Sequence, residues 1–368
     1  MGRIGLRIFS LTIFLSYVLI PLIINFLNLQ DLIYYNDVSF DLITSNLLCA
    51  LIPFVWSFNL KINYPKINFI RKGDHIFLIV IISILLFTVF NDFRFTKSII
   101  ISRSFDLLYP LLVVSAVLYS FNHTKRKIIL IIIFSILFIH TDSRGLLLFS
   151  VGSLILSNYV DKPIKINFYS VLFSFIFLIV FVFWGIYRED GQYTALFSFI
   201  FRVSEPYWYF ASENSSSISI YDILKRISWA VTRVNFFNIE GNIDGNIYYI
   251  DKILSMDRPE NVSLPITLIG QGFLFKGKLG TYILVFLVTF LLSKTYSALS
   301  NFGHLGILYS VYLTVKVVNL HAKSISGAIS YLIYETVRDL LIIFVVWKFS
   351  SFIFKNYVFR RVDKYYKH

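Results

Sequence analysis

Most of this chain is a succession of apolar runs that are long enough to cross a lipid bilayer. The runs are about 17 to 25 residues long, which at a rise of 1.5 Å per residue matches a hydrocarbon layer of roughly 30 Å. A run such as KIILIIIFSILFI does not alternate in polarity as a barrel strand would. With 57% hydrophobic and 15% charged residues, the chain is also too apolar for a soluble domain of 368 residues. We therefore predict an all-α fold, a polytopic bundle of transmembrane helices.

About ten candidate spans can be placed on the sequence. They cover about residues 4–27, 40–60, 75–90, 104–121, 128–140, 145–160, 166–187, 280–298, 303–321 and 327–350. The first run follows Arg3 and Arg7 and has no small-residue cleavage site after it, so we interpret it as a spanning helix rather than a signal peptide. The single cysteine, Cys49, lies inside an apolar run and predicts neither a disulfide nor a thiol metal site.

The positive charges between the spans predict the topology. Lysine-rich connections follow spans two, four and six, and a basic tail follows the last span. Under the positive-inside rule these segments and both termini are cytoplasmic. The chain then divides into about seven spans in residues 1–187, an extracytoplasmic loop or cap in residues 188–279, and about three spans with a basic cytoplasmic tail in residues 280–368.

Arginine is enriched on the outward side of this topology, where the same rule would deplete it. A guanidinium group never loses its proton and recognises phosphate or carboxylate with two parallel hydrogen bonds. The sequence therefore predicts an anionic headgroup bound at the outer membrane surface. The alternative is that these arginines pair with loop acids such as Glu189 and Asp222, or reach lipid phosphates. The outward arginines are Arg94, Arg103, Arg144, Arg188, Arg202, Arg226, Arg233, Arg258 and, within the last span, Arg338.

Two helical pieces are expected within the long loop. Residues 195–210 are apolar but are interrupted by Arg202, Glu205 and Pro206, which predicts an interfacial helix rather than a span. Residues 221–237 form a second helical pattern, with Arg226 and Arg233 seven residues apart on one face.

Two short motifs flank the loop. The turn at residues 140–145 contains Ser143, Arg144 and Gly145, where a helix start would present free N–H groups and a guanidinium to one anion. Residues 263–280 contain Pro265 and several glycines that allow tight turns and close backbone approach, which predicts a re-entrant or surface-lying hairpin before span eight. The alternatives are a polar hairpin turn at the first motif and a plain helix entry with glycine packing at the second.

The last two spans carry charges. Glu335, Arg338 and Asp339 lie on one helical face, and charges within a membrane pair with one another or mark a functional site. Two acids against one base leave a spare negative charge, for which Arg144 or another outward arginine is the expected partner. His321 stands with Lys316 at the outward end of span nine and is a candidate general base; the alternative is a polar interface residue.

Taken together, these motifs resemble the O-antigen polymerase family of bacterial oligosaccharide repeat-unit polymerases. The resemblance rests on Ser143, Arg144 and Gly145, followed by Pro265, Gly270, Gly277 and Gly280. Family members more often have Glu where this chain has Gln271, which argues against an acid at that position.

The resemblance implies a glycosyltransferase of the bacterial inner membrane. Its partners would be an undecaprenyl-pyrophosphate-linked oligosaccharide, membrane lipids and a chain-length regulator, without nucleic acid or a cofactor. The candidate pyrophosphate ligands are Arg144, Arg188, Arg202, Arg233, Arg258 and Arg338. The candidate catalytic residues are Glu205, His321 and Glu335. No residue cluster has metal-ligand spacing, so we expect no metal requirement.

Two other functions fit the composition. A ligase that moves finished glycan from the lipid carrier usually offers a histidine in its long loop, and residues 188–279 contain none. A flippase or transporter for lipid-linked oligosaccharide would have more spans with short loops, or a repeat of broken helices in both halves, and the sequence shows no such repeat.

Overall fold

The computed structural model describes residues 1–26, 39–62, 99–121, 123–141, 144–160, 219–232 and 267–353. Within these residues the secondary structure is helical, without strands. The prediction of an all-α fold is therefore confirmed for this part of the chain.

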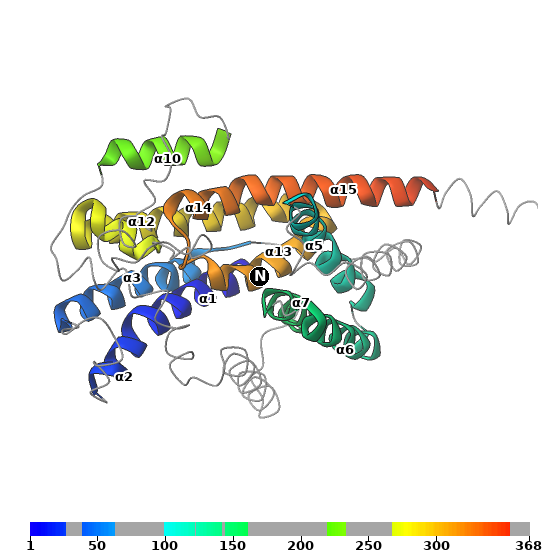
Figure 1. Ribbon diagram of the computed structural model, residues 1–368, viewed down its shortest axis with the longest axis horizontal. Helices are drawn as coiled ribbons and strands as arrows, with labels where there is room; N and C mark the ends of the chain where they lie inside the picture. Colours follow the sequence, from blue (N-terminus) through cyan, green and yellow to red (C-terminus); the bar gives the residue numbers. More distant parts are fainter. Residues whose placement is uncertain are drawn as a thin grey trace, which may run out of the picture.

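The first part of the chain contributes two groups of helices. Helix α1 continues through a π-helical turn, η1, into α2 and packs along α3, while α6 and α7 form a hairpin beside α5 (Figure 1). The bounds are α1 (Gly2–Phe14), η1 (Leu15–Leu19), α2 (Ile20–Phe26), α3 (Phe40–Asn59), α5 (Ile99–Ser120), α6 (Thr124–Thr141), α7 (Arg144–Leu156) and the short η4 (Ser157–Tyr159).

The last part of the chain forms the centre of the bundle and one side of it. Helix α13 contacts α1, α5, α7, α12 and α15, and α10 packs against α14 and η6 along one side of the bundle (Figure 1). The bounds are α10 (Ile220–Thr232), α12 (Leu268–Asn301), α13 (Gly303–Lys316), η5 (Val317–Asn319), α14 (Ile325–Ile329), η6 (Ser330–Glu335) and α15 (Thr336–Ile353).

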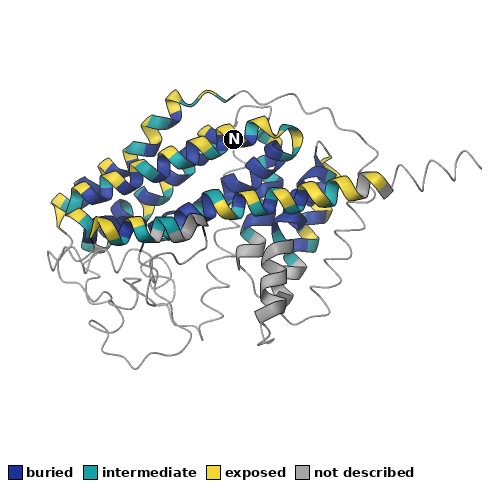
Figure 2. Cartoon of the chain, turned by 90° about the horizontal axis from the view of Figure 1, so that it is seen from above, coloured by how far each residue is buried: buried dark blue, intermediate teal, exposed yellow. Residues whose placement is uncertain are grey.

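Burial explains why α13 is central. All its residues from Gly306 to Val315 are buried, and they are apolar, hydroxyl-bearing or glycine. A helix without a charged face over this length cannot face water, so it is enclosed by its neighbours. The hydroxyls bond within the helix, as from Thr314 Oγ1 to the Ser310 carbonyl at 2.7 Å. Figure 2 shows this burial along the facing sides of the helices and exposure on their outer sides.

The exposed sides of several helices are apolar. On α3 the side chains of Val55 and Phe58 are exposed, and on α15 those of Leu341 and Val345 are. Three helical stretches are long and apolar enough to cross a membrane: Gly2–Ile23, Phe40–Asn59 and Leu268–Asn301. Exposed apolar faces on helices of this length fit a lipid environment. The predicted spans at 75–90 and 166–187, and the predicted interfacial helix at 195–210, lie outside the described residues.

Helix α12 contains a sharp reversal where a hairpin was predicted. Lys276 and Gly277 leave the helical conformation, and Gly277 has a φ of 59°. A short first limb, residues 268–275, thereby turns back against the long limb that follows. The two limbs touch so closely that a Cβ atom on Gly280 would lie 2.2 Å from the Gly272 carbonyl oxygen. The glycine spacing thus predicted both the turn and the close approach.

Candidate functional site

His321 lies where the connection after α13 meets α1 and the first limb of α12. Its ring is buried, with Nδ1 2.8 Å from the Val318 carbonyl oxygen and Nε2 3.2 Å from Ser16 Oγ. A carbonyl can only accept, so Nδ1 carries a proton and donates it. None of these contacts within the described residues is with a carboxylate, and a buried charged ring would lack a counter-ion. The imidazole is therefore neutral, and its Nε2 accepts from the Ser16 hydroxyl.

The π-helical turn η1 places Ser16 beside the histidine. Pro21, the second residue of α2, has no N–H. In a regular α-helix the Tyr17 carbonyl would accept a hydrogen bond from the N–H of residue 21, so the proline leaves this carbonyl without that donor. The Asn46 side chain of α3 donates to that carbonyl at 3.3 Å. The ring of Tyr17 packs edge-on against His321, with the ring centroids 6.3 Å apart. Such π-turns inside helices are frequent at functional sites.

Gln271 joins the first limb of α12 to the start of α14. Its Oε1 accepts from the Ile325 N–H at 2.7 Å, and the Leu268 N–H donates to the His321 carbonyl at 3.3 Å. Gln271 is fully buried, and its Nε2 has no hydrogen-bond partner among the described residues. At this position the chain therefore has a structural amide rather than an acid.

One ion pair connects α13 with η6, and a second lies within α15. Lys316 Nζ lies 3.2 Å from Glu335 Oε2, and Arg338 Nη2 lies 2.7 Å from Asp339 Oδ1. The other Asp339 oxygen accepts from the Tyr309 hydroxyl at 3.0 Å. We call these residues with Tyr309 the ion-pair cluster. The spare carboxylate was predicted to pair with Arg144 or another outward arginine; among the described residues Glu335 pairs with Lys316.

The ion-pair cluster is largely enclosed. The Asp339 side chain has no exposed surface, while Lys316, Glu335 and Arg338 keep 15%, 26% and 27%. Charges held this far from water persist only when they are paired and hydrogen-bonded. Thr336 helps to place them, because its hydroxyl donates to the Tyr331 carbonyl five residues back, within the π-helical turn η6.

Aromatic rings surround the cluster. Tyr309 and Tyr312 are in contact at 5.6 Å between centroids, and Tyr109 of α5 meets Tyr312 at 6.3 Å. Lys316 Nζ lies 4.2 Å from the centroid of Tyr331. No motif in the sequence pointed to these tyrosines, to Ser16 or to the pairing of Lys316. The available signals were a proline five residues after Ser16 and a lysine four residues after Tyr312.

The predicted site residues fall into three groups. Glu335 and Arg338 come together in the ion-pair cluster, and His321 lies in the connection that follows Lys316. Gly270, Gly277 and Gly280 form the α12 hairpin, and α7 begins at Arg144, followed by Gly145, where a helix start was predicted. Outside the described residues lie Ser143, Arg188, Arg202, Glu205, Arg233, Arg258 and Pro265.

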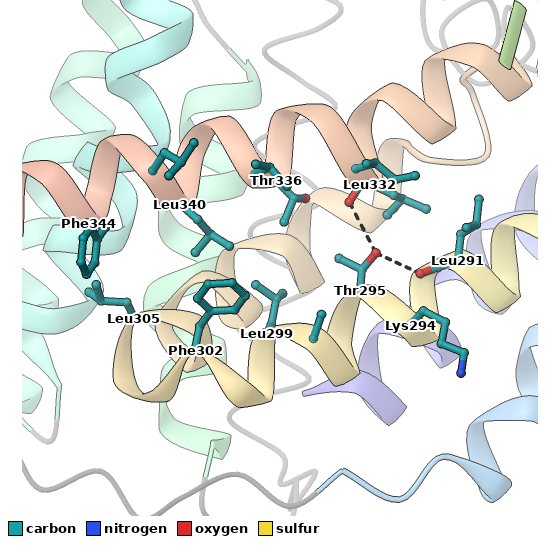
Figure 3. Close-up of a pocket in the computed structure, with 14 residues that line it drawn as sticks. Leu291, Lys294, Thr295, Leu299, Phe302, Leu305, Leu332, Thr336, Leu340 and Phe344 are labelled. Atoms are coloured by element: carbon teal, nitrogen blue, oxygen red, sulfur yellow. Dashed lines mark hydrogen bonds between the residues drawn. The ribbon is translucent and has the colours of Figure 1, made fainter. Parts of the chain in front are cut away.

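An apolar groove of about 610 Å³ runs between α12 and α15 (Figure 3). Leu291, Leu299, Leu340 and Phe344 contribute to its walls. The hydroxyl of Thr295 donates to the Leu291 carbonyl at 2.9 Å, so its proton is already engaged within the helix. The groove thus offers alkyl contacts rather than polar recognition.

The described residues contain no group of three His, Cys, Asp or Glu side chains close enough to hold a metal ion. The chemistry available around His321 and in the ion-pair cluster consists of a neutral imidazole with a hydroxyl partner, two ion pairs and a group of phenols. Comparisons of the chain with family models, with curated proteins and with solved structures give no match.

Proposed function

We propose that this protein is a glycan polymerase of the bacterial inner membrane. It would join undecaprenyl-pyrophosphate-linked repeat units into a surface polysaccharide such as O-antigen or capsule. The proposal includes a bundle of about ten spans, an extracytoplasmic loop in residues 188–279 and cytoplasmic termini. Its sequence basis is the resemblance carried by Ser143, Arg144 and Gly145 and by the glycines of the α12 hairpin.

The observation that best supports a chemical role is the ion-pair cluster within helices of membrane proportions. Lys316, Glu335, Arg338 and Asp339 lie in a bundle whose outer faces are apolar. Keeping charges in such surroundings is costly, and proteins that keep them there commonly use them for binding or for proton transfer. The apolar groove between α12 and α15 adds a place that suits a long hydrocarbon chain.

The proposed reaction needs a base and an anion site. An acceptor sugar hydroxyl attacks the anomeric carbon of the donor glycan, the bond from that carbon to the diphosphate breaks, and the hydroxyl proton passes to a protein base. His321 is the favoured base because its Nε2 accepts protons and already bonds the Ser16 hydroxyl. Glu335 and Glu205 are the carboxylate alternatives. Positive side chains stabilise the charge that develops on the departing diphosphate.

The test is the glycan phenotype of a deletion strain of the source bacterium. Deletion of the gene is expected to abolish long-chain surface glycan while single repeat units still reach the surface. Wild-type protein should restore long chains, and His321→Ala and Glu335→Gln should restore them poorly although the proteins insert normally. The exposed residue Lys348 supplies the control, because Lys348→Gln should restore long chains fully.

The same assay separates the alternatives. Loss of a flippase would leave no repeat units on the outer side of the membrane. Loss of a ligase would leave long chains attached to the carrier lipid. Either pattern contradicts the polymerase proposal.

A further inference from the structure

We propose that Lys316 and Lys323, which both approach the ring of Tyr331, form a binding site for a diphosphate group. Contacts among the described residues support the site itself. Its assignment to the diphosphate of a lipid carrier rests on the proposed function. It differs from the sequence prediction, which gave this role to arginines.

The ammonium groups of the two lysines lie close to the same aromatic ring. Lys316 Nζ lies 4.2 Å and Lys323 Nζ 5.3 Å from the centroid of Tyr331. The two ammonium groups are therefore less than about 10 Å apart, a separation that one diphosphate can bridge with a hydrogen bond at each end.

Cationic side chains outnumber carboxylates among the described residues of this region. Lys316, Lys323 and Arg338 bring three cations to this region, against the two carboxylates of Glu335 and Asp339. Those carboxylates pair with Lys316 and Arg338, so among the described residues Lys323 has no ion-pair partner. Like charges repel at this separation, and a bound anion between them would remove the repulsion. Counted over the described residues, the surplus charge at this site is positive, whereas the sequence count suggested a negative one.

The ring that both lysines approach carries a buried hydroxyl donor without a partner among the described residues. The hydroxyl of Tyr331 is buried and has no hydrogen bond among the described residues, and the residue as a whole is 3% exposed. An unpaired buried hydroxyl is costly, so its presence beside two cations points to an acceptor that the described residues do not supply.

Packing at the base of its side chain orients Lys323. A Cβ atom added to Gly327 would lie 3.4 Å from Lys323 Cβ and 3.3 Å from Ser324 Oγ, so the lysine stem packs over this glycine. The stem is supported at its base, and the ammonium lies over Tyr331. Lys323 is only partly exposed, which limits competition from water for a bound anion.

Arg338 is a weaker candidate for the same ligand. Both its Nε and its Nη2 donate to Asp339 Oδ1, at 2.9 and 2.7 Å, so its donor fork is already occupied by a carboxylate. A diphosphate could use only the remaining N–H groups of a guanidinium whose charge is already balanced by Asp339. Lys323 can accept a ligand without breaking an ion pair among the described residues.

The experiment measures binding to the full-length protein in phosphatidylcholine nanodiscs. Inorganic pyrophosphate and farnesyl diphosphate serve as probes in calorimetry, and nanodiscs containing phosphatidylglycerol test competition by a lipid headgroup. Lys323→Gln should weaken the binding of both probes about tenfold to a hundredfold, because it removes a charge-assisted hydrogen bond. Tyr331→Phe keeps the ring and should weaken binding less.

Two further variants make the result decisive. Lys316→Gln combined with Glu335→Gln removes the pair without leaving a lone buried charge, and it should weaken binding as Lys323→Gln does. Lys348→Gln removes another lysine stacked on a ring, 5.5 Å from the centroid of Phe344, and should not change binding.

The outcomes separate the two proposals. Diphosphate binding that depends on Lys323, in a protein whose deletion leaves long-chain glycan intact, would support the site and reject the polymerase. Unchanged binding by Lys323→Gln, or no binding by the wild-type protein, rejects the site even where polymerase activity is found. Loss of binding in phosphatidylglycerol nanodiscs would assign the site to lipid headgroups and reject the carrier as its ligand.

Discussion

At the scale of single residues, Gln271 illustrates how a buried amide can hold two segments far apart in the sequence. Its Oε1 accepts the first N–H of α14, and the residue, which belongs to the first limb of α12, is fully buried. A carboxylate there would accept the same hydrogen bond but would bring a charge into an enclosed position. A glutamine at this position therefore fits a stabilising role.

Substitution of Gln271 tests this role. Gln271→Ala leaves the Ile325 N–H buried without an acceptor, so the free energy of unfolding in detergent micelles should fall by about 1–3 kcal/mol. Thr44→Ala is the control, since that exposed hydroxyl bonds only the Phe40 carbonyl of its own helix and its loss should change stability little. Equal stability of the two variants would contradict the role given to Gln271.

The sequence predicted some of these residues but not their partners. Glu335, Arg338 and Asp339 were placed on one helical face, and charge counting then suggested a distant arginine as the missing partner. The actual partner, Lys316, lies on α13, and its contact with Glu335 depends on the rotation of two packed helices. Ser16 and His321 are 305 positions apart, and no local pattern specifies such a contact.

At the scale of elements, the α12 hairpin was predictable and the π-helical turns were not. Glycine spacing is a local signal, because only glycine allows both a positive φ at Gly277 and the contact of Gly272 with Gly280. The turns η1 and η6 depend on tertiary contacts, such as the one from Asn46 to Tyr17. The turn η1 carries Ser16, which the sequence did not indicate, and η6 carries Glu335, which was predicted without its partner Lys316.

The hairpin glycines should differ in their tolerance of a methyl group. A Cβ atom on Gly272 would lie 2.5 Å from the Thr281 Cα, so Gly272→Ala must push two backbones apart and should lower stability by about 3 kcal/mol. Gly277 has open space around it but a positive φ, so Gly277→Ala should lower stability by only about 1–2 kcal/mol.

Unfolding in mixed detergent micelles gives both values. Gly303 is the matched control for Gly277, because it combines a φ of 61° with open space and lies outside the hairpin. A Gly272→Ala protein as stable as Gly277→Ala would contradict the close packing of the two limbs.

At the scale of the whole molecule, the amino-acid composition alone indicated a lipid environment. Apolar runs of spanning length predicted a helical membrane protein, and the described helices carry apolar side chains on their outer faces. The number of membrane spans and the orientation of the chain across the membrane depend on connections that lie outside the described residues.

Cysteine labelling in intact cells tests the proposed topology. Cys49 is buried, so it should react little with a membrane-impermeant maleimide. Lys225→Cys on α10 should react from outside the cell, because α10 belongs to the proposed extracytoplasmic loop. Lys125→Cys, at the exposed start of α6, should react only after the membrane is opened. The reverse pattern would overturn the orientation.

The short limb of α12 has a consequence for the order in which the protein assembles. With about eight residues it spans roughly 12 Å, too little to enter a bilayer as an independent helix. The partner of Gln271 is Ile325, 54 positions later, so this contact forms only after the ribosome has synthesised α13 and the start of α14. The long limb of α12 can insert first, while the short limb waits at the membrane surface. The region around His321 is therefore completed at the end of biogenesis, and a chain that stops before α14 cannot build it.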